Sequence, residues 1–172
     1  MRAIAIIGGL AASAWLTGNV VLAAVAMTMF GSLTDSIGEA SGRSAAGQAF
    51  GDILAWWAPA VWPLFALLAV AVVARAGQSL GTGRRAAPLA AIVLTLGLAG
   101  THLYTHHLVG AVAAARDALP ADSVASEDPD FQKLHKTSER MMGLETVLVL
   151  VVGCLLPMLA VGQRHAERPS DG

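Results

Sequence analysis

Four long stretches of the chain carry no Asp, Glu, Lys or Arg: residues 3–34, 53–74, 86–115 and 146–163. An α-helix of about 20 apolar residues, rising 1.5 Å per residue, spans the hydrocarbon core of a bilayer. The charged residues lie almost entirely between and after these stretches. The pattern predicts an all-α, polytopic membrane protein: one four-transmembrane-helix bundle with spans at about residues 4–31, 53–75, 87–115 and 141–163.

The composition agrees with this prediction and limits the function classes. Charged residues make up 13% of the chain and hydrophobic residues 55%, against roughly 25% charged in soluble domains. We expect residues 1–165 to form a single membrane domain, followed by a disordered tail at 166–172, which leaves no room for a separate catalytic domain. A net charge of −1 offers no basic surface for nucleic acid, so the expected partners are the lipid bilayer and a second copy or a membrane partner protein.

The basic residues predict an orientation. Arg84 and Arg85 lie in the short connection between the second and third spans, and short connections rich in Arg remain in the cytoplasm. Both termini then also lie in the cytoplasm, because two spans precede and two follow this connection. We expect a multi-pass protein of the plasma membrane.

Local signals predict where two helices begin. Pro88 suits the first turn of the third helix, and Asp128 followed by Pro129 is typical of a capped helix start. The last helix would then run from about residue 129 to 163, roughly 50 Å against a hydrocarbon core of about 30 Å. We expect this extended fourth helix to project as a stalk, with Phe131 and Leu134 on an apolar stripe that packs against the first loop, residues 31–52.

Small side chains predict where helices approach closely in the membrane. These residues lie on the first and third spans: Gly8, Gly9, Ala12, Ala14, Gly18, Gly97 and Gly100. Trp56, Trp57 and Trp62 lie near one end of the second span, which is typical of anchors at the membrane interface.

Polar residues inside the predicted spans are costly unless they are paired or face water. Besides the histidines of the third span, Asn19 lies on the first span and Glu145 lies near the start of the fourth. Glu145 can pair with Asn19, a histidine or Arg140, or it can serve as a proton or ion relay.

Two pairs of possible metal ligands have the same helical spacing. His102 and His106 are four residues apart on the third helix, as His135 and Glu139 are on the fourth. If the pairs meet, imidazole and carboxylate suit zinc, copper or iron, and the histidines suit haem. The alternative is a hydrated polar rim with no cofactor, in which these side chains bond to water, lipid headgroups and carbonyl groups.

Three segments resemble a known family. Phe131, Leu134, His135 and Ser138 form an F-x-x-L-H-x-x-S stretch that leads into the last span. The first span contains W-L-T-G at residues 15–18 and continues to F-G-S-L at residues 30–33, and a G-x-x-F segment follows at residues 47–50. They resemble the transmembrane-protein-205-like family of small four-helix membrane proteins, a domain of unknown function. The resemblance implies a four-helix integral membrane protein with no established activity, in which His135 and Ser138 form the recurrent polar motif.

Two functional hypotheses follow. In the first, which we favour, the protein is a non-enzymatic structural or accessory membrane module, and His135 and Ser138 fasten the first loop to the fourth helix. In the second, His102, His106, His135 and Glu139 bind a metal ion or haem for copper handling or electron transfer, an idea that a more distant likeness to copper-resistance membrane domains also supports.

Overall fold

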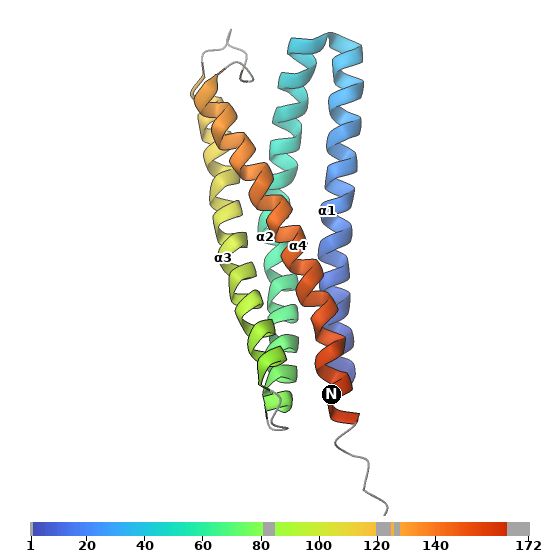
Figure 1. The fold of residues 1–172 in the computed structure, drawn as a ribbon. Helices are drawn as coiled ribbons and strands as arrows, with labels where there is room; N and C mark the ends of the chain where they lie inside the picture. Colours follow the sequence, from blue (N-terminus) through green and yellow to red (C-terminus); the bar gives the residue numbers. More distant parts are fainter. Residues whose placement is uncertain (1, 81–84, 120–124, 126–127, 165–172) are drawn as a thin grey trace, which may run out of the picture. The chain divides into compact units, whose positions relative to one another are not determined.

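The protein is built of long helices. The structure, a computed structural model, describes residues 2–80, 85–119, 125 and 128–164. Within these ranges it contains four α-helices and no strand: α1 (Arg2–Ile37), α2 (Glu39–Leu80), α3 (Ala86–Asp117) and α4 (Pro129–Arg164) (Figure 1). All four are long and apolar enough to cross a membrane. The predicted all-α, four-helix membrane bundle is confirmed, whereas the predicted tail at 166–172 lies outside the described residues.

Each helix is longer than a bilayer core requires. The four helices contain 36, 42, 32 and 36 residues in chain order. Since about 20 residues suffice to cross the hydrocarbon region, every helix extends beyond it. The predicted extended fourth helix is confirmed, and α2 is longer still.

The connection between α1 and α2 differs from the expected loop at residues 31–52. Only Gly38 separates the two helices, with φ of 87°, and its N–H donates to the carbonyl oxygen of Thr34 at 3.1 Å. This is the left-handed glycine cap that ends many helices. Gly42 allows α2 to turn back closely, because a Cβ there would lie 2.5 Å from the backbone nitrogen of Thr34. Two glycines therefore create a sharp hairpin, and the other glycines in this segment lie in helix.

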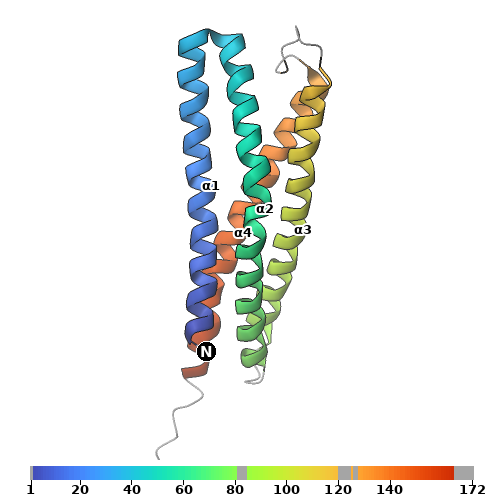
Figure 2. The same ribbon diagram turned by 180° about the vertical axis from the view of Figure 1, so that it is seen from behind.

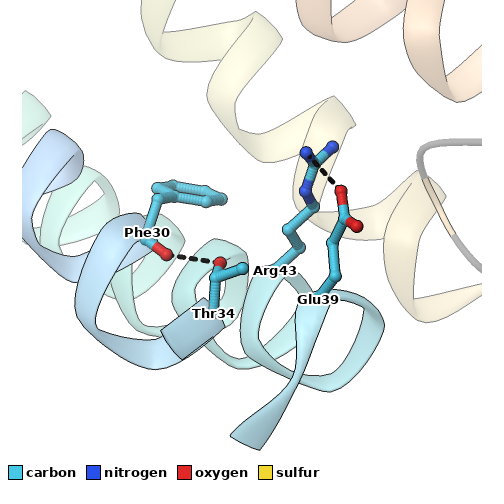
Figure 3. A network of polar contacts seen from close by, with 4 residues as sticks. All are labelled: Phe30, Thr34, Glu39 and Arg43. Carbon is cyan, nitrogen blue, oxygen red and sulfur yellow. Dashed lines mark hydrogen bonds and ion pairs between the residues drawn. The ribbon is translucent and has the colours of Figure 1, made fainter. Parts of the chain in front are cut away.

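Polar contacts close to this hairpin are local (Figure 3). The Thr34 hydroxyl donates to the carbonyl oxygen of Phe30 at 2.5 Å, and Arg43 pairs with Glu39 at 2.7 Å, one turn apart on α2. Both charged side chains are largely exposed, so their ion pair adds little to stability. The glycine geometry, not the ion pair, fixes the hairpin.

The predicted starts of α3 and α4 are confirmed. Asp128 precedes α4, and its Oδ1 accepts a hydrogen bond of 2.7 Å from the backbone N–H of Phe131, as an N-cap does. Pro129 is the first residue of α4, where its missing N–H needs no partner. Pro88 is buried in the first turn of α3.

The chain divides into two compact units, each containing part of all four helices. Unit 1 comprises Met1–Leu16, Trp62–Gly100 and Glu145–Gly172, and unit 2 comprises Thr17–Val61 and Thr101–Leu144. In unit 1, the end of α2 and the start of α3 run side by side in opposite directions in both views (Figure 1, Figure 2). In unit 2, the end of α1 and the start of α2 do the same. Each unit therefore has its own helix packing.

Candidate functional site

A buried acid–indole pair lies in unit 1. Glu145 of α4 is 5% exposed, and its Oε1 accepts a hydrogen bond of 3.2 Å from Nε1 of Trp15 on α1, which is fully buried. The Trp15 ring meets Phe65 of α2 edge to face, with centroids 6.5 Å apart. A polar contact and an aromatic contact thus join three helices at one place. The expected partners of Glu145 did not include Trp15.

Small residues elsewhere in unit 1 allow the helices to approach closely. A Cβ on Gly8 would collide with the Cβ of Ala71 on α2 and lie 2.8 Å from Leu156 on α4. A Cβ on Gly153 would lie 3.2 Å from Ala12. The prediction that small residues mark close approach is confirmed at Gly8, whereas a Cβ at Gly9, Gly97 or Gly100 would meet no heavy atom within 4 Å, so the prediction is wrong there. Among the predicted glycines, only those that face a neighbouring helix, Gly8 and Gly18, have this role.

A second indole hydrogen bond lies in unit 2. Nε1 of Trp57 on α2 donates to Oδ1 of Asn19 on α1 at 3.2 Å, and the pair is partly buried. The Trp57 ring covers Gly18, where any Cβ would collide with the ring atoms. Trp57 therefore holds two helices together, although the sequence predicted an interface anchor. Its neighbour Trp56 is 72% exposed, as an anchor facing lipid would be.

The four predicted metal ligands all belong to unit 2, but their environments differ. His102 is 2% exposed, whereas His106, one turn later on α3, is exposed. His135 and Glu139 are both exposed on α4, with Nε2 of His135 3.2 Å from Oε1 of Glu139, and the His135 ring stacks on Phe131 at 5.8 Å. Among the residues that the structure describes, no three His, Cys, Asp or Glu side chains are placed to hold a metal ion. The metal or haem hypothesis stays a prediction without a preformed site among them.

The two residues of the recurrent polar motif differ in burial. Ser138 is 6% exposed and faces the interior of unit 2, whereas about half of the His135 side chain is exposed. On α3 of the same unit, Thr101, His102 and Thr105 are also buried. His102 was predicted from the sequence, whereas the two threonines were not. Their spacing of four residues, which places both on one helical face, was the available signal.

Comparisons with known proteins add no relative to this description. No family model, curated protein or solved structure matches the chain. The function must therefore be inferred from the chain's own side chains.

Proposed function

We propose that this protein is a non-enzymatic membrane module, a structural or accessory component that acts through a stable helix bundle rather than through a reaction. The observation that carries the proposal is the use made of Glu145. An acid inside a membrane helix is costly and is often functional. Here its Oε1 accepts the Trp15 indole N–H in the core of unit 1.

Other polar groups of the apolar helices also link one helix to another. Trp57 donates to Asn19 between α2 and α1, and the Ser79 hydroxyl of α2 donates to the carbonyl oxygen of Leu159 on α4 at 3.1 Å. Such hydrogen bonds, together with close contacts at small residues, are what associates helices in lipid. This use of polar groups supports a packing role over a catalytic one.

The proposal includes an orientation. We place the protein in the plasma membrane. We place both termini in the cytoplasm, because Arg84 and Arg85 occupy the short connection between α2 and α3. A maleimide reagent that does not cross membranes tests this in intact cells, using a Cys154→Ser background with either Ser126→Cys or Ser170→Cys. We expect labelling of the first variant only. Labelling of the second variant alone contradicts the orientation.

Purified protein tests the proposed function itself. We expect detergent-purified protein to contain no stoichiometric metal by elemental analysis and to show no haem absorption near the Soret region. A contrary outcome is stoichiometric metal or haem that is lost in His102→Ala and His135→Ala but kept in the matched variant His107→Ala. This outcome contradicts the proposal and supports the metal hypothesis. The resemblance to the transmembrane-protein-205-like family is compatible with the proposal, as is assembly with a second copy or a membrane partner.

A further inference from the structure

One arginine is buried in a part of unit 1 that is poor in acidic residues. Arg75 lies in α2, five residues before the helix ends at Leu80, and is only 6% exposed. Its Nε atom is buried and has no hydrogen-bond partner among the described residues. A guanidinium group is always charged, so burial without an anion is strongly unfavourable.

Glu145 of α4 is the only acidic residue that the structure describes in unit 1. It packs beside a part of α2 that is distant from Arg75 along the helix. Its partner Trp15 contacts Phe65. Phe65 precedes Arg75 by ten residues, which is roughly 15 Å along a helix. One turn after Arg75, Ser79 bonds to Leu159 of α4, fourteen residues after Glu145. Glu145 is therefore not the counter-ion of Arg75.

The position of Arg75 suits a lipid headgroup. It lies about 7.5 Å along the helix from the end of α2, close to where the apolar stretch of the sequence ends. Residues 75–85 contain Arg75, Arg84 and Arg85 and no acidic residue. The segment 164–172 carries Glu167 and Asp171 alongside Arg164 and Arg168, and residues 165–172 lie outside the described part of the chain. The membrane is a source of anions at this level of α2, and the test below distinguishes it from this segment.

We propose that Arg75 binds the phosphate group of an anionic phospholipid in the leaflet next to the α2–α3 connection. A guanidinium group offers a planar fork of donors that matches phosphate oxygens. Basic sites between transmembrane helices are a known form of headgroup recognition. In this proposal the buried guanidinium of Arg75 alone holds the phosphate.

Thermal unfolding in a mild detergent tests this site. Protein with short-chain phosphatidylglycerol added is compared with protein given the same amount of phosphatidylcholine, for the wild type, Arg75→Gln, Arg75→Lys and Arg85→Gln. Arg85 is the matched control, because it is an exposed arginine at the same end of the bundle. We expect phosphatidylglycerol to raise the midpoint of the wild type and of Arg85→Gln, and Arg75→Gln to need about tenfold more lipid for the same shift. Arg75→Lys, which keeps the charge but loses the fork, should fall between them.

Three results overturn the proposal. An unchanged response of Arg75→Gln and Arg75→Lys to phosphatidylglycerol would show that Arg75 is not the site. An equal midpoint shift with inorganic phosphate would identify a free-anion site instead of a lipid site. The third result has two parts: a variant ending at Arg164 is as unstable as Arg75→Gln, and the wild type does not respond to lipid. Together they would identify the C-terminal segment as the partner of Arg75. If Arg75→Gln does not fold, Arg75→Lys and native mass spectrometry of co-purified lipid give the same distinction.

Discussion

Each of the two units contains an indole that donates a hydrogen bond to a polar side chain of another helix, but the two pairs differ in burial. In unit 1, Trp15 is fully buried and its acceptor is the carboxylate of Glu145. In unit 2, Trp57 is half-buried and its acceptor is the amide oxygen of Asn19. A hydrogen bond that water cannot replace costs more to break than one with water nearby. The same chemistry should therefore contribute more to stability in unit 1.

The largest effect is expected from removing the ring of Trp15. Trp15→Ala should lower the free energy of unfolding by about 3–5 kcal/mol, because it creates a cavity and removes the donor to Glu145. Circular dichroism during unfolding in detergent measures this. The matched variant is Trp56→Ala, whose ring is 72% exposed and which should change stability by no more than about 0.5 kcal/mol. Equal losses in the two variants would contradict the assignment of Trp15 to the core.

A smaller loss of stability is expected when one methyl group is added at Gly8. Gly8→Ala places a Cβ against Ala71, whose Cβ cannot rotate away, so the helices must shift at a cost of about 1–3 kcal/mol. Gly9→Ala is the matched control, since a Cβ there meets nothing within 4 Å. The two unfolding midpoints, measured in the same detergent, should differ clearly. A lower midpoint for Gly9→Ala than for Gly8→Ala would mean that α1 is rotated relative to this description.

The two glycines also show how far the sequence predicts the structure. The absence of charge predicts four spans, and Asp128 with Pro129 predicts the start of α4, because both signals are contained in contiguous residues of the chain. Gly8 faces a neighbouring helix and Gly9 does not, because of the rotation of α1 about its axis. Contacts with residues far away in the chain determine that rotation. The partner of Glu145 is likewise 130 residues away. The sequence did not identify Gly38 as the residue that ends α1 for a different reason. Several nearby glycines have the same conformational freedom to end a helix.

Substitution of the two acceptors compares the pairs directly. Glu145→Leu removes the acceptor from the buried Trp15 indole and should cost about 1–3 kcal/mol, whereas Asn19→Leu should cost less than about 1 kcal/mol, because the partly buried pair is easier to rehydrate. Glu145→Gln keeps an oxygen that can accept the bond and serves as the control, with most of the stability retained. Equal losses in the two Leu variants would show that the burial difference has no energetic consequence.

The smallest effect is expected at the exposed pair of unit 2. The side chains of His135 and Glu139 are 51% and 62% exposed, so water competes for both groups and salt screens their attraction. A double-mutant cycle with His135→Ala, Glu139→Ala and the double variant should give a coupling energy below about 0.5 kcal/mol, while His135→Ala alone lowers the unfolding midpoint slightly through the lost contact with Phe131. A coupling energy above about 1 kcal/mol that disappears when a chelator is added would instead show that His135 and Glu139 hold a metal ion. This exposed pair would then contribute to stability as the buried pair of unit 1 does.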